Sequence, residues 1–412
     1  MIVDSKKEYA HRKGVGRGSA SFERLELAAV GIEAEFNVVV DGLPAKPEDV
    51  FRDPRDFLGR KLMHRTGRSY SIPTGGAVYF DTGVIEVVTP VIEIDRGCAA
   101  RAGRSLWEGI RIVRAGLDGW ERRTGRSVRL VGFSTHYNVS FELPREAQGR
   151  HRSVAKLAKL LSYILPVPMM LVATNRRSTG VGVRPRGDRI EVTADFTPDA
   201  SLMIAAGSLV TGIVRSVMEW PSFELSMLRS MKVPVLEGYA PMPHTSRKGW
   251  LARNDCYISS PFACDVDALE WDVVGRDEPA SLRSVAREIF AKFAPAIRRV
   301  SDPFSFRLIA AICAGRASSL LELDDRPPAY EDVGRLCAWS DKYSEHSLPR
   351  SRYERVLMAA ISGRRLYVDG ASYTPVGMRG WTRVVFRRDH DRTRHVIHID
   401  MLTSRLDEWE GC

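Results

Sequence analysis

The sequence predicts an α+β protein built on a mainly antiparallel sheet with helices packed on one face. Strand patterns at 77–81 and 84–89, and again at 127–133 and 138–142, are joined too tightly for parallel crossovers. Apolar residues at helical spacing recur after these pairs, as at 99–120. Strands and helices interleaved in this way favour one antiparallel layer covered by one helical layer.

The expected elements follow in chain order. A strand within 24–40 is apolar and β-branched, and it ends at the Asp41-Gly42 turn signal. The following elements are the strands 77–81 and 84–89 hinged at Thr82-Gly83, a helix at 99–120, strands at 127–133 and 138–142 around a loop at His136, a helix at 153–164, a strand at 190–193 and an apolar helix at 202–218. Helices are expected at 281–300, 304–323 and 351–362, and strands return at 381–386 and 395–400.

Four parts are predicted from this pattern. They are a flexible basic leader (1–24), an α+β core (25–235), a loop and largely helical region (236–365) and a small C-terminal β-hairpin element (366–412).

Composition restricts the class of protein. The 412 residues are 44% hydrophobic and 27% charged, which excludes a disordered, collagenous or coiled-coil chain. The longest apolar run, 160–173, is interrupted by two prolines and is too short to cross a membrane. Six dispersed cysteines indicate reduced thiols and a cytoplasmic protein. A net charge of +10 favours acidic partners such as phosphates and carboxylates.

Two pairs of acids lie inside apolar strand patterns. Glu33 and Glu35 are two residues apart, so they share one face of a strand, and adjacent carboxylates repel unless a cation lies between them. Asp81 and Glu86 flank the Thr82-Gly83 turn. Clustered carboxylates suit Mg²⁺ or Mn²⁺ better than zinc. A solvated strand face is the alternative for Glu33 and Glu35.

Two further groups carry nitrogen donors and positive charge. His136 and Asn138 are also two residues apart and could contact the same ion or a phosphate, although such a histidine is more often structural. Arg184, Arg186 and Arg189 precede Glu191 in another strand, where a charged surface loop is the alternative.

Taken in order, these motifs resemble the glutamine synthetase-like carboxylate–amine ligase superfamily, which includes the glutamate–cysteine ligases, the amidoligases and the prokaryotic ubiquitin-like protein ligase. The resemblance spans about 28–215 and implies a curved sheet whose concave face holds ATP and Mg²⁺ or Mn²⁺. It implies metal ligands at Glu33, Glu35, Glu86, His136 and Glu191, and phosphate or substrate contacts at His136, Asn138, Arg184, Arg186 and Arg189. Asp81 would act on the incoming amine. The second glutamate expected after Glu86 is not clearly present, since Glu93 is seven residues on.

The activity implied is ATP-dependent amide-bond formation through an acyl phosphate, between a carboxylate and the amine of an amino acid, peptide or protein side chain. Arg247 and Lys248, in a Pro-containing loop, are candidates for a substrate loop, with a plain connection as the alternative. A homo-oligomer is compatible with the sequence, and no membrane partner is expected.

Other functions stay open. The same architecture supports a kinase or an amide hydrolase. A nucleic-acid-binding protein is the alternative of another class, because 96–130 holds nine arginines against three acids and 379–394 holds six arginines. The first run lies on the polar face of a predicted helix without interleaved aromatics, so nucleic acid is not the expected partner.

Overall fold

The computed structural model describes residues 27–59, 63–65, 67–141, 152–244, 248–322 and 349–411. The predicted leader at 1–24 and Arg247 lie outside these ranges. The class is α+β, as predicted, and every strand pairing in the described ranges is antiparallel.

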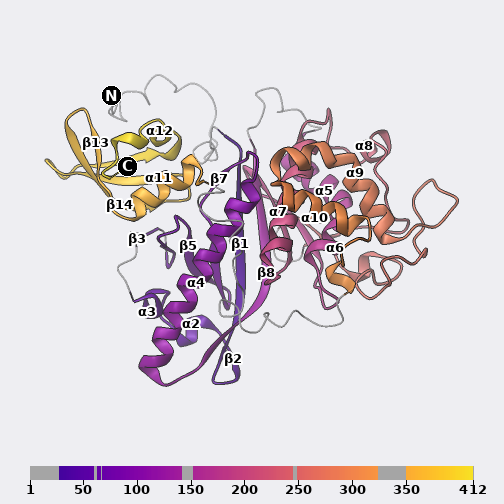
Figure 1. Cartoon of the computed structure of the whole chain (residues 1–412), viewed down its shortest axis with the longest axis horizontal. Coiled ribbons are helices and arrows are strands. Elements are labelled where there is room, and N and C mark those ends of the chain that lie inside the picture. The colour runs from indigo at the N-terminus through magenta and orange to yellow at the C-terminus, as the bar shows by residue number, and fades with distance from the viewer. Residues whose placement is uncertain are drawn as a thin grey trace.

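One large sheet forms the centre of the molecule (Figure 1). In spatial order its strands are β11 (Met242–Pro243), β12 (Trp250–Ala252), β9 (Val181–Pro185), β10 (Arg189–Asp195), β8 (Val128–Ser140), β1 (Ala29–Val40), β6 (Val84–Val88), β5 (Ala77–Asp81), β4 (Tyr70–Ser71) and β3 (Met63–His64). The short strands β2 (Leu43–Ala45) and β7 (Ile92–Glu93) also pair with β1.

The alternation of β1 decides which face of the sheet is covered. Ile32, Ala34 and Phe36 are fully buried beneath the helical layer, whose long members are α4 (Cys98–Thr124) and α7 (Ala200–Met218). A Cβ atom on Gly207 of α7 would lie 3.6 Å from the Ile32 side chain, so this helix crosses directly over the strand. Glu33 and Glu35, at the intervening positions, therefore point to the opposite face.

Further helices surround this core. They are α5 (Val154–Ile164), α6 (Pro166–Ala173), α9 (Leu282–Val300), α10 (Pro303–Cys313) and the short α2 (Pro47–Val50), α3 (Arg55–Leu58) and α8 (Ser226–Ser230). The helix α7 is long and apolar enough to cross a membrane, but 72% of its most apolar 18-residue stretch is buried inside the protein, as in a core helix. The helices α5 and α6 reach that length and apolarity only as a pair, and they are bent by 62° relative to each other.

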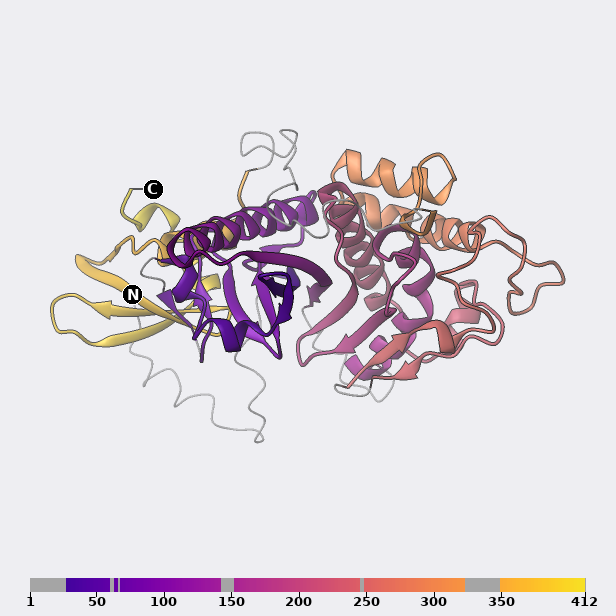
Figure 2. The same cartoon turned by 90° about the horizontal axis from the view of Figure 1, so that it is seen from below.

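Residues 366–398 form a second, smaller sheet. It consists of β13 (Leu366–Val368), β14 (Ala371–Arg379), β15 (Arg383–Arg388) and β16 (Arg394–His398), and it packs on α11 (Arg352–Ile361) and α12 (Ile399–Thr403) around its own core. We call residues 352–411 the C-terminal element. Figures 1 and 2 place it at the opposite end of the molecule from α9 and α10. The predicted division at 365/366 stays a prediction, although α11 shares the core of the strands that follow it.

Three sequence expectations about elements were wrong. The two strands around a loop at His136 are one strand, β8, because residues 134–136 pair with both β1 and β10. The helix expected at 304–323 ends at Cys313, before Gly315 at φ +68°, and within the described residues up to 322 it is followed by a 3-10 turn at Leu320–Glu322. The strands β9 and β14 were missed, since arginines and a proline interrupt their apolar pattern.

Candidate functional site

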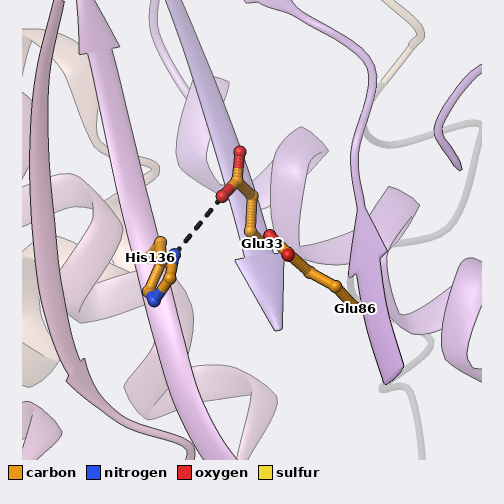
Figure 3. Close-up of side chains that lie close together, drawn as sticks. All are labelled: Glu33, Glu86 and His136. Carbon is orange, nitrogen blue, oxygen red and sulfur yellow. Dashed lines mark hydrogen bonds and ion pairs between the residues drawn. The ribbon is translucent and has the colours of Figure 1, made fainter. Parts of the chain in front are cut away.

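Acids from separate parts of the chain meet on the face of the sheet opposite α4 and α7. Glu35 and Glu86 are register partners on β1 and β6, and Glu33 is the register partner of His136 on β8. Glu33, Glu86 and His136 each offer an atom within 4.8 Å of the others (Figure 3). His136 Nδ1 lies 3.3 Å from Glu33 Oε2. Antiparallel pairing of three neighbouring strands thus assembles residues that are 50 and more positions apart.

A second group adjoins the first and shares Glu86. Glu35, Asp81 and Glu86 also offer one oxygen each within 4.8 Å of the others. The Ser134 hydroxyl donates to Glu35 Oε2 and lies 3.1 Å from His136 Nε2. We call Glu33, Glu35, Asp81, Glu86 and His136 the carboxylate cluster.

A β-bulge opens the sheet beside the cluster. The register between β1 and β8 shifts between Glu35 and Phe36, so Phe36 pairs with Gly132 and Phe133 is the extra residue. Phe133 is 47% exposed at this point. A Cβ atom on Gly132 would lie 2.2 Å from the Phe196 ring, which explains why glycine is needed there. Bulges commonly redirect side chains next to functional sites.

Glu191 occupies a different environment from the cluster. It accepts hydrogen bonds from Arg186 Nε at 2.6 Å and from Arg186 Nη2 at 3.0 Å, and Arg184 Nη1 lies 3.0 Å from Oε1. The distance from Glu191 Oε1 to His136 Nδ1 is 4.0 Å. Burial raises the pKa of Glu191, but the two arginines outweigh burial and bring the pKa below its usual range. Glu191 therefore faces guanidinium groups, and it reaches the cluster only at its edge.

Burial sets the electrostatics of the cluster. Burial, and then the charge of Glu33, raise the pKa of Glu86 to about 10. Burial also raises the pKa of Glu33, but the hydrogen bond and charge of His136 outweigh it and bring this pKa down to about 2. For His136, burial lowers the pKa, and the neighbouring Glu33 and Glu35 more than reverse that effect. The lowered pKa of Glu33 favours its ionised form and the raised pKa of Glu86 favours its protonated form, which reduces the repulsion between these neighbouring carboxylates.

This donor set fits a hard divalent cation. Carboxylate oxygens dominate it, no thiolate is present among the described residues of the cluster, and a cation would let both Glu33 and Glu86 ionise. Zinc sites, in contrast, favour nitrogen and sulfur donors. Mg²⁺ or Mn²⁺ is the better match.

The cluster lies between two cavities. The larger, of about 820 Å³, is lined by Glu35, Thr82, His136, Arg184 and Arg253, among others. The smaller, of about 70 Å³, lies between the main sheet and the C-terminal element, and its lining includes Glu33, Asn138, Arg189 and Trp381. Arg189 Nε donates to Asn138 Oδ1 at 2.9 Å on this side. Each cavity is therefore lined by a glutamate of the carboxylate cluster, Glu33 in the smaller and Glu35 in the larger.

Sequence reasoning missed several residues of this region. The Arg65 guanidinium lies 3.2 Å above the Trp381 ring centroid, and Arg65 Nη2 donates to the Gly380 carbonyl. Burial lowers the pKa of Arg65 to about 10. Tyr79 is the register partner of Glu86. A contact between residues 65 and 381 leaves no local signal, whereas Tyr79 could have been found from its place opposite Glu86 in the predicted hairpin.

The predicted site residues fall into three sets. Glu33, Glu35, Glu86, Asp81 and His136 come together. Asn138 and Arg189 lie at the small cavity, while Arg184 and Arg186 hold Glu191. Lys248 is exposed before β12, and in this part of the chain His244 and Arg253 line the large cavity.

No family model and no curated protein matches the chain. Among solved structures, the chain is similar to the crystal structure of the complex between the prokaryotic ubiquitin-like protein Pup and its ligase PafA, with a TM-score of 0.49 and 12% sequence identity over 92% of each chain. At this identity the likeness concerns the course of the chain, and the chemistry has to be argued from the side chains.

Proposed function

We propose that the protein is an ATP-dependent carboxylate–amine ligase that forms an amide bond through an acyl phosphate, with Mg²⁺ or Mn²⁺ at the carboxylate cluster. The observation that carries the proposal is the convergence of Glu33, Glu35, Glu86 and His136 on one sheet face between two cavities. The net charge of +10 agrees with anionic substrates.

The first role of the cluster is to hold a divalent cation. Glu33, Glu86 and His136 form one candidate ligand set, and Glu35, Asp81 and Glu86 form the other. When bound, such a cation neutralises charge on phosphate oxygens. The chain supplies the oxygen donors at positions fixed by strand register, and a buried site strengthens their hold on the cation.

Arginines supply fixed positive charge on both sides of the cluster. Arg184 lines the large cavity, and Arg189 lines the small one. Guanidinium groups bind phosphate and carboxylate with two parallel hydrogen bonds. In this mechanism they stabilise the charge on the transferring phosphoryl group, because phosphoryl transfer depends mainly on positioning and electrostatics.

Activation and amide formation need a proton acceptor as well. A carboxylate reacts with an amine only after ATP has phosphorylated it, and the attacking amine must lose a proton. Asp81 is the proposed base, because it ends β5 at the margin of the cluster, next to Thr82 on the wall of the large cavity. The balance is acid plus amine plus ATP, giving amide, ADP and phosphate.

The two cavities suit different substrates. The small cavity has an apolar lining that suits a nucleobase, formed by Val88, Pro90, Val91 and Trp381. Its volume of about 70 Å³ holds only a few waters. To admit a nucleobase, the turn at 380–382 would have to move outward. Arg184, Arg253 and His244 give the large cavity a basic lining that suits the carboxylate substrate. Trp381→Ala is therefore expected to raise the KM for ATP by about tenfold in steady-state kinetics, while Trp250→Ala, outside the small cavity, leaves it unchanged.

The test is a substrate screen with two readouts. Protein, ATP and MgCl₂ are incubated with pooled amino acids and short peptides, ADP release is followed, and products are identified by mass spectrometry. We expect amine-stimulated ADP release and a product equal to acid plus amine less water. Glu86→Gln should lower the rate by roughly 100-fold or more, and Glu237→Gln, at an exposed acid, should not.

Other products would point to other functions. A phosphoester without an amide would indicate a kinase, and ATP-independent cleavage of an amide would indicate an amide hydrolase. Salt-sensitive binding of DNA or RNA without any ATP turnover would favour the nucleic-acid-binding alternative. Full activity in Glu86→Gln would contradict the assigned site.

A further inference from the structure

The turn between β5 and β6 has an unusual residue at its first position. Thr82 has φ +52° and Gly83 has φ +96°, so both residues of this two-residue turn are left-handed. Such turns favour Asn-Gly or Asp-Gly, because these residues tolerate positive φ. A β-branched residue at positive φ is a genuine outlier that costs free energy.

Two other hairpins of the same chain show what this turn ordinarily takes. The turn between β1 and β2 is Asp41-Gly42, at φ +51° and +83°, and the turn between β13 and β14 is Asp369-Gly370, at φ +48° and +75°. The backbone geometry matches that of Thr82-Gly83. Threonine thus replaces the favourable residue only in the turn that adjoins the carboxylate cluster.

Packing does not explain the threonine. Thr82 is exposed, and its side chain lies on the wall of the large cavity. Its specific contact is a hydrogen bond from Oγ1 to Asp81 Oδ1 at 2.9 Å. Asp81 in turn offers an oxygen to the group with Glu35 and Glu86. The hydroxyl therefore fixes a carboxylate of the cluster from the side of the large cavity.

A residue of α2 also holds the backbone of this turn. Glu48 Oε1, on α2, accepts a hydrogen bond from the Gly83 amide at 3.0 Å. This contact fixes the backbone of the turn, whereas Thr82 fixes the side chain that leaves it. Strained residues persist where surrounding contacts hold them, and they gather at functional sites.

We infer that Thr82 is a positioning residue that holds Asp81 in the orientation required by the candidate site formed with Glu35 and Glu86. This inference rests on the proposed function, which makes Asp81 a candidate cation ligand together with Glu35 and Glu86. Thr82 itself contacts neither the proposed cation nor the reacting atoms. Its hydroxyl acts through Asp81, as outer partners of metal ligands do.

A double-mutant cycle on the full chain tests the inference, with Mn²⁺ as the probe and free Mn²⁺ measured by electron paramagnetic resonance. Thr82→Val keeps the shape and removes the hydroxyl, and we expect it to weaken Mn²⁺ binding by about three- to tenfold. Thr82→Ser keeps the hydroxyl and should restore wild-type affinity. In an Asp81→Ala background, which removes the acceptor of the Thr82 hydroxyl, Thr82→Val should have no further effect on Mn²⁺ affinity.

Thermal unfolding supplies the second arm. Thr82→Asn should raise the midpoint by about 1–3 °C, because asparagine tolerates the left-handed conformation. Asp369→Thr, the matched control in a distant turn, should lower the midpoint by a similar amount and leave Mn²⁺ affinity unchanged.

The outcomes separate the two proposals. If the wild type binds no Mn²⁺, the proposed function fails and this inference fails with it. The positioning role alone is wrong if the wild type binds Mn²⁺ and Thr82→Val binds it equally well. It is also wrong if Thr82→Val weakens Mn²⁺ binding as much in the Asp81→Ala background as in the wild type.

Discussion

At the scale of single residues, the order of side chains along strands determined most of the site. The spacing of Glu33 and Glu35 predicted a shared face, and the family resemblance implied that Glu86, in the hairpin at 77–89, would lie near them. His136 was expected in a loop, yet it lies within β8 opposite Glu33. Arg65 and Trp381 could not be predicted, because their contact joins positions that only the tertiary fold brings together.

Glu86→Gln separates the effect of Glu86 on folding stability from its effect on metal binding. The raised pKa of Glu86 favours its protonated form at pH 7, and glutamine imitates that neutral form. We expect the free energy of unfolding without metal to stay within about 1 kcal/mol of the wild type or to rise, while Mn²⁺ affinity falls. Denaturant unfolding and Mn²⁺ titration measure the two effects. A large loss of stability without metal would show that Glu86 is ionised there.

Cation binding should release protons. The pKa of Glu86 is about 10 in the folded protein and about 4.5 when unperturbed, so the folded, metal-free state binds the extra proton between these values. Through this group, stability falls as pH rises across that window, and a bound cation removes the effect. Calorimetry with MnCl₂ at pH 7 in two buffers of different ionisation enthalpy should report about one proton released per cation. Equal heats in both buffers would contradict this.

At the scale of elements, strand and helix periodicity predicted the core, and tertiary pairing decided the rest. Polar residues around His136 suggested a break, but pairing on both sides keeps β8 continuous. The C-terminal element was recognised by its strands alone. A buried ion pair, Arg104 with Glu354, joins it to α4, and the two side chains are 3% and 0% exposed.

Glu354→Ala should loosen the C-terminal element. Glu354 accepts hydrogen bonds from Arg104 and from the Ser351 amide at the start of α11, so its loss leaves a buried guanidinium without this carboxylate. We expect destabilisation of about 3–5 kcal/mol in denaturant unfolding. Glu408→Ala removes an exposed pair with Arg405 in the same element and should cost under about 1 kcal/mol. Equal effects would show that the buried pair does not anchor the element.

At the scale of the whole molecule, the carboxylate cluster lies where the main sheet meets the C-terminal element on one side and the large cavity on the other. Composition and charge predicted a protein for anionic partners, and the arginines at both cavities agree with that expectation. The arrangement of the two sheets lay beyond the sequence, because no local pattern encodes how 352–411 packs on the core.

Magnesium and ATP together should stabilise the protein. Ligands that bind only the folded state raise stability by about 2.7 kcal/mol at 100 times Kd. The thermal midpoint should therefore rise with MgCl₂ and ATP, return to baseline with EDTA, and change little in Glu33→Gln. A rise that survives EDTA would place the nucleotide elsewhere.

The most direct test of the central claim is anomalous X-ray diffraction from crystals grown with MnCl₂ and a non-hydrolysable ATP analogue. The account predicts manganese peaks within coordination distance of Glu86 and of Glu33 or Glu35, with the triphosphate beside them. Manganese peaks only at other places, or a triphosphate bound away from these carboxylates, would contradict it.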